Sequence, residues 1–138
     1  MLLLWLFSRF STELIVLFIC RGNRYRSRIA EEVFNRNAPK DFIAESAGIH
    51  YQRWNDRATP RVLREIGIEL TKRKPRKLSK QMLEKTSKII IFDGVKIPSK
   101  KVEVWPVKDC HAGDEKCIRK GRKQIEKHVG KLIENLKS

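Results

Sequence analysis

A short apolar segment that ends in a cysteine constrains this chain more than any other feature. Residues 14–19 carry no charge and include three β-branched side chains, and Cys20 follows them directly. Such a segment is typical of a strand buried on both faces of a parallel sheet. Five residues separate Cys20 from Arg26 and Ser27, where a helical pattern begins that ends before Pro39. We therefore expect Cys20 at the carboxyl end of a strand, beneath the N-terminus of a helix.

This arrangement predicts a binding site for a tetrahedral oxyanion. Free backbone N–H groups at a helix start converge on one point, and the helix dipole adds partial positive charge there. Gly22 and Asn23 tolerate the left-handed backbone that such a loop needs, and the Arg26 guanidinium adds a planar set of donors. We expect this positive field to favour the thiolate form of Cys20. A thiolate beside a phosphate-binding loop indicates phosphoryl transfer through a phosphocysteine.

The remainder of the chain alternates strand patterns with helix patterns. Apolar segments predict further strands over residues 41–48, 88–93 and 102–105. Helices are predicted with Thr59 and Ser79 as their N-terminal caps, and a last one from about Asp114 to Leu136. Strands that alternate with helices indicate a parallel sheet covered on both faces, with right-handed crossovers. Functional sites in such sheets lie outside the carboxyl ends of the strands, as Cys20 does here.

The loop after the first strand also resembles a known family. The chain is similar to the low-molecular-weight protein tyrosine phosphatases and the related thioredoxin-coupled arsenate reductases in the segment Cys20-Arg21-Gly22-Asn23-Arg24-Tyr25-Arg26-Ser27. The resemblance implies an α/β fold, a three-layer αβα sandwich whose four-stranded parallel sheet has helices on both faces. It also implies hydrolysis of a phosphomonoester without metal or cofactor. In that reaction the loop from Arg21 to Arg26 binds phosphate, and Ser27 donates a hydrogen bond to the Cys20 thiolate.

Three further residues take roles from this resemblance. In the family, a serine in a Ser-Ala-Gly sequence hydrogen-bonds the loop asparagine, which pairs Ser46 with Asn23. A tryptophan forms a wall of the active-site cleft, and Trp54 is the candidate. The general acid, which later activates water, is an aspartate between the last strand and the final helix. Asp109 occupies that place, and Asp114 is the second choice.

Several positions depart from the family pattern. Tyr25 stands where many members have a protective second cysteine, Arg28 replaces a proline, and Arg73 lies near the place of a histidine behind the loop serine. The aromatic residues that usually follow the acid and grip a phenyl ring are absent. Their absence favours a phosphomonoester in general over phosphotyrosine alone, so the substrate is predicted as a phosphorylated protein or a small phosphomonoester. Arg21, which directly follows Cys20 at the entrance of the expected site, favours a substrate with extra negative charge.

Cys110 and Cys117 keep a second reaction open. Arsenate reductases of this fold pass a disulfide from the nucleophile to two cysteines seven residues apart, and this pair has that spacing. In those enzymes, however, the pair follows the third strand, which here ends in Phe92-Asp93-Gly94. With His111 and His128 the two cysteines also form a candidate zinc set. They lack the paired Cys-x-x-Cys spacing of strong zinc sites, and we expect no metal site.

The charge of the chain suggests a third alternative. Its 138 residues carry a formal net charge of +15, with a dense basic run at residues 72–77. A non-catalytic basic domain that binds acidic partners or nucleic acid would have this composition. Aromatic side chains do not interleave with the basic run, so no specific nucleic-acid partner is expected. Three cysteines are too few for a disulfide framework, and a reactive thiol favours the cytoplasm.

Residues 1–13 are predicted as an N-terminal extension to a phosphatase-like domain over residues 14–138. The apolar block Met1–Phe7 is too short to span a bilayer, and Arg9 and Glu13 separate it from the first strand. No membrane span is expected. An extra packing segment, a weak membrane contact and a mis-assigned start remain open for these residues, and the protein is expected to be a monomer or weak dimer.

Overall fold

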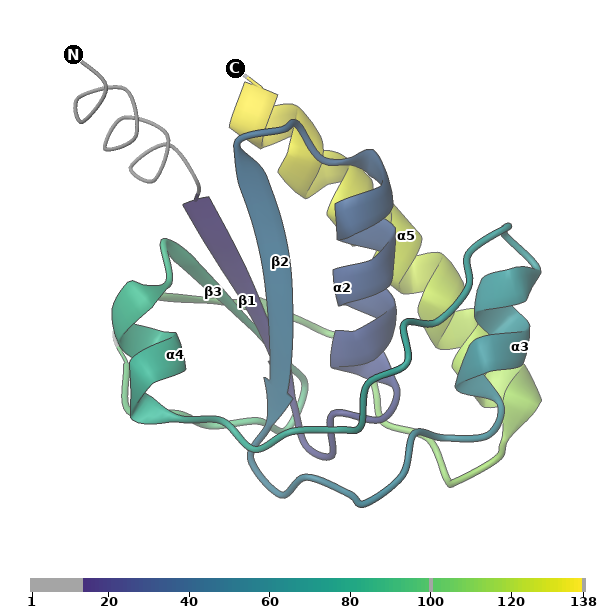
Figure 1. The fold of residues 1–138 in the computed structure, drawn as a ribbon. Coiled ribbons are helices and arrows are strands. Elements are labelled where there is room, and N and C mark those ends of the chain that lie inside the picture. Colours follow the sequence, from purple (N-terminus) through teal and green to yellow (C-terminus); the bar gives the residue numbers. More distant parts are fainter. Residues whose placement is uncertain (1–13, 100, 138) are drawn as a thin grey trace, which may run out of the picture.

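A computed structural model describes residues 14–99 and 101–137 of the chain (Figure 1). Four parallel strands form one sheet in the order β2-β1-β3-β4, which confirms the predicted sheet. The strands are β1 (Leu14–Cys20), β2 (Phe42–Gly48), β3 (Lys88–Phe92) and β4 (Val102–Trp105). Within the described residues, no helix is both long and apolar enough to cross a membrane. The predicted extension, residues 1–13, lies outside the described residues.

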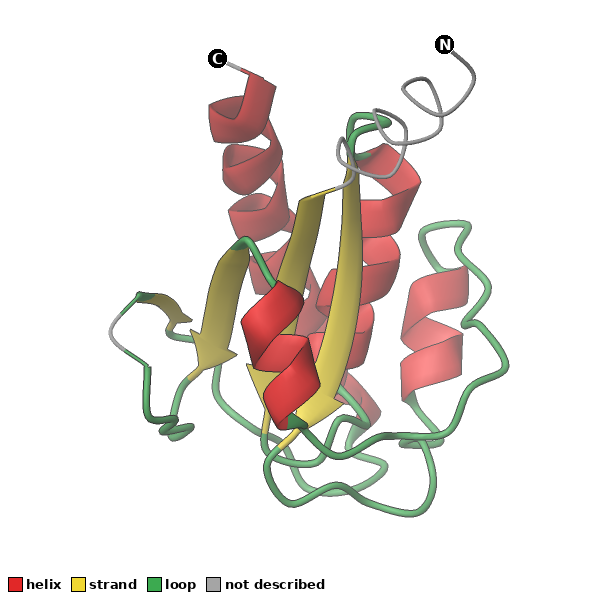
Figure 2. Cartoon of the chain, turned by 60° about the vertical axis from the view of Figure 1, so that its left-hand side comes forward, coloured by secondary structure: helices red, strands yellow, loops and turns green. Residues whose placement is uncertain are grey.

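Helices cover both faces of this sheet, as predicted. Figure 1 shows α2 (Arg26–Asn37), α3 (Thr59–Arg64) and α5 (Glu115–Lys137) on one side and α4 (Lys80–Lys85) on the other. In Figure 2, α4 lies in front of the strands. Because successive strand residues point to opposite faces, β1 contributes to both cores. Val16 and Phe18 pack in the core beneath α2 and α5, and Leu17 and Ile19 pack in the core beneath α4.

Local sequence signals define the ends of two helices. The side chain of Ser79 accepts a hydrogen bond from the Met82 backbone N–H at 3.2 Å, so Ser79 caps α4 as predicted. At the start of α5, Asp114 Oδ1 accepts a hydrogen bond from the Cys117 backbone N–H at 3.1 Å. Asp114 is therefore used as a helix cap, which satisfies a backbone donor that has no partner within the helix.

The start of α3 differs from the prediction that Thr59 caps it. Thr59 is the first residue of the helix, the N-cap position is Ala58, and no side chain caps this end. The Thr59 hydroxyl instead donates a hydrogen bond to the Arg24 carbonyl at 3.0 Å. The capping prediction is wrong because this hydroxyl is used to anchor the loop that follows β1.

Gly121 in α5 marks a close approach between that helix and the same loop. A Cβ atom at Gly121 would lie 1.5 Å from the Tyr25 hydroxyl oxygen. Tyr25 is buried and directly precedes Arg26. The glycine therefore gives the tyrosine ring room against α5 and so helps to place the loop.

Candidate active site

The turn from β1 to α2 encloses the side chain of Cys20. Asn23 in this turn has a φ angle of 55°, the left-handed conformation that asparagine tolerates. This backbone geometry points the Asn23 N–H at Cys20, and it donates a hydrogen bond to the Sγ atom at 3.3 Å. Cys20 is a free cysteine and is 3% exposed. The sulfur thus lies at the end of a parallel strand and under the loop, as predicted.

A chain of hydrogen bonds runs from Cys20 to Ser46. The Asn23 side-chain amide donates to Ser27 Oγ at 2.8 Å and to Ser46 Oγ at 2.9 Å. Ser27 Oγ lies 2.9 Å from Cys20 Sγ. Because Ser27 already accepts from Asn23, its own proton is free to be donated to the sulfur. The structure therefore contains the predicted contact between Ser46 and Asn23, and it places Ser27 to stabilise negative charge on Cys20.

Arg73 extends this chain away from the sulfur. Its Nη2 donates to Ser46 Oγ at 2.9 Å and also to a Glu31 carboxylate oxygen, and its Nη1 lies 3.4 Å from Asn23 Oδ1. The Arg76 backbone N–H donates to the same Asn23 oxygen at 2.9 Å. Part of the basic run over residues 72–77 is therefore built into the support of the loop, where the sequence alone left the role of Arg73 open.

Arg26 is fixed by backbone carbonyl groups and keeps an unsatisfied donor. Its Nη1 donates to the carbonyl oxygens of Asp93, after β3, and Val107, after β4, each at 2.8 Å. Its Nη2 lies 3.7 Å from Asp109 Oδ2. Within the described residues its buried Nε has no hydrogen-bond partner. A buried guanidinium held in place with a spare donor is the arrangement that binds an anion.

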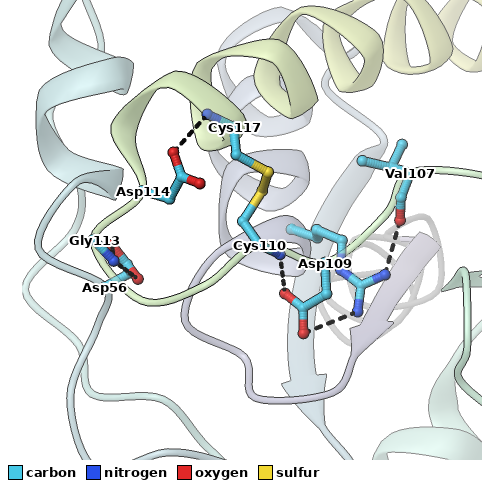
Figure 3. The surroundings of a disulfide bond; sticks show 8 residues. Asp56, Val107, Asp109, Cys110, Gly113, Asp114 and Cys117 are labelled. Carbon is cyan, nitrogen blue, oxygen red and sulfur yellow. Dashed lines mark hydrogen bonds and ion pairs between the residues drawn. A yellow bond between two sulfur atoms is a disulfide. The ribbon is translucent and has the colours of Figure 1, made fainter.

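Asp109 lies beside this arginine, in the segment between β4 and α5 (Figure 3). Its Oδ1 accepts a hydrogen bond from the Cys110 backbone N–H at 2.9 Å, and its side chain is 44% exposed. Asp114 instead turns toward the first turn of α5, where it caps the helix. The structure thus places Asp109, and not the second choice Asp114, next to the motif arginine.

Cys110 and Cys117 are joined by a disulfide bond, with their Cα atoms 5.9 Å apart (Figure 3). Three cysteines suggested no disulfide framework, yet this pair is bonded because the segment after Asp109 folds back onto the first turn of α5. The bond uses both sulfurs, so the zinc set considered from the sequence does not form. His128, another member of that set, stacks on Trp105, with 5.0 Å between the centres of the two rings. Among the described residues, no group of three or more His, Cys, Asp or Glu side chains could hold a metal.

A pocket of about 450 Å³ opens over the loop. Its residues come from the loop, from the segment after β2 and from the segment around the disulfide: Arg21, Gly22, Arg24, Gln52, Asp109, Cys110, His111, Ala112, Asp114 and Cys117. The predicted phosphate-binding residues thus divide into two groups. Arg21, Gly22 and Arg24 line the pocket, whereas Asn23, Tyr25 and Arg26 are buried beneath it. Burial raises the pKa of the Tyr25 hydroxyl above its ordinary range, so this side chain stays neutral.

Trp54 does not line this pocket, in contrast to the predicted cleft wall. It is 67% exposed and lines an adjacent pocket, where Lys74 Nζ lies 5.3 Å from the centre of its ring. The backbone N–H of Gln52 donates to the Gly22 carbonyl at 3.0 Å. This hydrogen bond holds Gln52 beside the loop and places Trp54 further out.

Asp56 is a part of the site that the sequence did not reveal. This buried carboxylate accepts hydrogen bonds from Arg24 Nη1 at 3.1 Å, from the Ala58 N–H at 2.9 Å and from the Gly113 N–H at 2.9 Å (Figure 3). It therefore ties the loop after β1 to the segment that carries Asp109. A lone aspartate before a helix start reads as an ordinary cap, so no sequence signal marked its second function.

Arg28 is a second residue whose role was missed. It is fully buried and donates to Asn55 Oδ1 at 2.6 Å and to the carbonyls of Arg73 at 2.8 Å and Thr71 at 3.1 Å. Burial, together with the nearby Arg73, lowers the pKa of Arg28 below its ordinary value. The residue that replaces the family's proline thus ties α2 to the two long loops that flank the site.

A family model matches residues 15–100 of the chain, and its description is low molecular weight phosphotyrosine protein phosphatase. Among solved structures, an arsenate reductase from Archaeoglobus fulgidus DSM 4304 is 32% identical, with a TM-score of 0.76. That match covers 86% of this chain and 98% of the reductase. No curated protein sequence matches the chain.

Two further structures share the fold at lower identity. A low-molecular-weight protein tyrosine phosphatase from T. tengcongensis is 23% identical with a TM-score of 0.78, over 89% of this chain and 99% of that chain. The YwlE arginine phosphatase from Geobacillus stearothermophilus is 19% identical with a TM-score of 0.78, over 90% of this chain and 93% of that chain. The fold is therefore shared by proteins named for three different activities.

Proposed function

This chain belongs to the low-molecular-weight phosphotyrosine protein phosphatase family, and on that basis we propose that it hydrolyses phosphomonoesters through a phosphocysteine at Cys20. One observation carries the proposal. Arg26 is locked by two carbonyl groups and keeps a buried Nε donor without a partner among the described residues, beside the turn that encloses the sulfur. A phosphoryl group in the loop would satisfy that donor.

In the first step, the Cys20 thiolate attacks phosphorus and the bond from phosphorus to the ester oxygen breaks. Asp109 donates its proton to that oxygen, so the alcohol or phenol leaves in neutral form. The loop N–H groups and the Arg26 guanidinium stabilise the charge on the non-bridging oxygens in the transition state. The product of the step is phosphorylated Cys20.

In the second step, the Asp109 carboxylate takes a proton from water while the water oxygen attacks phosphorus. The bond from phosphorus to sulfur breaks, which releases inorganic phosphate and restores the thiolate. Ser27, whose hydroxyl proton is free to point at the sulfur, makes Cys20 a better leaving group. No metal or cofactor takes part in this scheme.

The family name supports phosphotyrosine in proteins as the substrate, and a small phosphomonoester fits the same chemistry. We further propose that the catalytic domain spans residues 14–138, with residues 1–13 as an extension, and that it works in the cytoplasm as a monomer or weak dimer. The free Cys20 thiol supports a reducing compartment.

Arsenate reduction is a second candidate, favoured by the bond between Cys110 and Cys117 and by the 32% identity to a protein named arsenate reductase. Cys20 would form a sulfur–arsenic(V) adduct, and the Cys110 thiolate would attack Cys20 to release arsenic(III). Cys117 would then attack Cys110 and free Cys20, which leaves the observed disulfide. A dithiol protein such as thioredoxin would reduce that disulfide. In a reducing compartment disulfides are usually transient and catalytic, which agrees with this role.

Hydrolysis of an aryl phosphate in the presence of a chelator tests the first proposal. Wild type should release phosphate, Cys20→Ser should abolish the reaction, and Asp109→Asn should slow it most for substrates with poor leaving groups. Asp114→Asn is the matched control and should retain activity. Activity that survives Cys20→Ser would remove the proposal.

The two candidates separate in a second assay. Phosphate release should persist in Cys110→Ser and Cys117→Ser if the protein is a phosphatase. Thioredoxin-coupled reduction of arsenate that is lost in either variant, with little phosphate release in wild type, would establish the reductase in its place.

A further inference from the structure

A second pocket lies beside the one that opens over the loop. Its volume is about 470 Å³, and it shares Arg24, Gln52 and Ala112 with the first pocket. The two pockets are therefore contiguous. The ion pair between Arg24 and Asp56 lies where the two pockets meet. Asp56 also accepts a hydrogen bond from the Gly113 N–H, which ties this place to the segment that carries Asp109.

The second pocket has positive charge that nothing else in the described residues neutralises. Arg53 and Arg57 both line it and are exposed, and neither has an acidic partner within the described part of the chain. Asp56 is the one carboxylate among the described residues that line the pocket, and it is already satisfied by Arg24 and two backbone N–H groups. The pocket is thus cationic and offers unpaired guanidinium groups.

The two arginines stand next to an aromatic surface. Arg57 packs against the acid-bearing segment, since a Cβ at Gly113 would lie 2.7 Å from Arg57 Nε. The exposed Trp54 ring lines the same pocket and has Lys74 at 5.3 Å from its centre. Cations beside a flat aromatic face suit a segment of polypeptide that carries carboxylates.

From this geometry we propose that the second pocket binds acidic side chains of the substrate, so that the substrate is a polypeptide with Asp or Glu next to its phosphorylated residue. The proposal rests on the phosphatase function and specifies its substrate. An extended chain advances about 3.3 Å per residue, so side chains one to three residues from the phosphorylated one enter the neighbouring pocket. Arg53 and Arg57 are specificity residues in this scheme and take no part in the chemical steps.

Two phosphotyrosine peptides of equal length test this, one with Glu and one with Gln at the positions flanking the phosphotyrosine. Wild type should show a kcat/KM about three- to tenfold higher for the Glu peptide, mostly through a lower KM, and high salt should reduce the ratio. The double variant Arg53→Gln/Arg57→Gln should bring the ratio to about one. It should leave hydrolysis of p-nitrophenyl phosphate within about twofold of wild type, because that substrate reaches only the first pocket.

A matched control removes the same two charges elsewhere. Lys123→Gln/Lys127→Gln changes two exposed lysines of α5 that line neither pocket, and it should keep the preference for the Glu peptide. Equal kcat/KM for the two peptides in wild type would overturn the inference. So would a preference that persists in the arginine variant, or one that the lysine control removes equally.

Binding of the same peptides to Cys20→Ser, measured by fluorescence anisotropy, tests the pocket without turnover. Failure of the phosphatase proposal would appear as absence of p-nitrophenyl phosphate hydrolysis in wild type, and failure of the pocket as equal affinity for the two peptides. Tighter binding of the Glu peptide that is lost in Arg53→Gln/Arg57→Gln would support the pocket in either case.

Discussion

Replacing Asn23 with alanine removes the side chain that holds the loop after β1 in its shape. The amide is fully buried and makes hydrogen bonds of 2.8–2.9 Å with Ser27, Ser46 and the Arg76 backbone N–H. At a net value of about 1 kcal/mol each, their loss amounts to about 3 kcal/mol. Alanine at a φ of 55° adds about 1 kcal/mol of backbone strain. We therefore expect Asn23→Ala to lower the free energy of unfolding by about 4 kcal/mol.

Asn23→Gly separates the two causes, because glycine adopts the left-handed conformation without that strain. It should lose about 1 kcal/mol less than alanine. Asn37→Ala is the control, since the Asn37 amide donates a single hydrogen bond to the Val33 carbonyl at the end of α2. Urea unfolding of the three variants gives the free energies. In the phosphatase assay, Asn23→Ala should lower kcat/KM about a hundredfold, since displaced N–H groups no longer meet the phosphoryl oxygens.

A loss of stability below about 1 kcal/mol in Asn23→Ala would refute the argument from hydrogen bonds. Equal stabilities of the alanine and glycine variants would refute the argument from backbone strain. Unchanged kcat/KM together with the expected loss of stability would show that the loop does not depend on Asn23 for its action on phosphate.

Three further predictions concern two buried residues and one partly buried histidine. Gly121→Ala should lower the free energy of unfolding by about 1–3 kcal/mol in urea unfolding, because its methyl group collides with the Tyr25 hydroxyl. Adding Tyr25→Phe should restore part of the loss, because it removes a buried oxygen that has no hydrogen-bond partner among the described residues. Arg28→Met should cost about 3 kcal/mol in the same measurement, because it removes the buried hydrogen bonds to Asn55, Thr71 and Arg73 and leaves Glu32 without its cation, whereas Glu31 keeps Arg73. Burial lowers the pKa of His128 below its ordinary 6.5, and the nearby Lys131 lowers it further. The folded state therefore binds fewer protons than the unfolded state, so the free energy of unfolding falls as the pH drops below about 6.5. His128→Gln should flatten the melting temperature across this range, whereas an unchanged slope would show that another group is responsible.

The loop to which we assign the chemistry could be predicted because its signals are local. An apolar run, a cysteine, a loop with Gly22 and Asn23, and a helix start follow one another in the sequence, so their order in space is nearly determined by their order in the chain. The place of Asp109 followed from chain order and from the rule that sites gather at the carboxyl ends of parallel strands. The contact between Ser46 and Asn23 came from the family resemblance.

The supporting contacts could not be predicted because they join residues far apart in the sequence whose types are ordinary on a surface. Arg73 lies in a basic run that reads as solvated, yet it reaches Ser46 and Glu31. The position of Arg28 at a helix start predicts an exposed side chain, yet the loop at Thr71 buries it. Trp54 was misplaced because the position of a loop side chain depends on backbone hydrogen bonds that no spacing encodes.

The bond between Cys110 and Cys117 was undetermined for a related reason. A separation of seven residues allows a disulfide, a redox pair or two unrelated thiols. The choice depends on whether the intervening segment folds back, which it does here against α5. The same bond is the observation that keeps arsenate reduction as a second candidate function.

Direct detection of the covalent intermediate tests the central claim. Rapid acid quenching of the protein with an aryl phosphate, followed by mass spectrometry of its peptides, should find one phosphoryl group on the peptide that carries Cys20. Asp109→Asn should increase that population with a good leaving group, because water attack then lacks its base. A phosphoryl group on another residue, or phosphate release with no phosphorylated Cys20 at any time, would contradict the account.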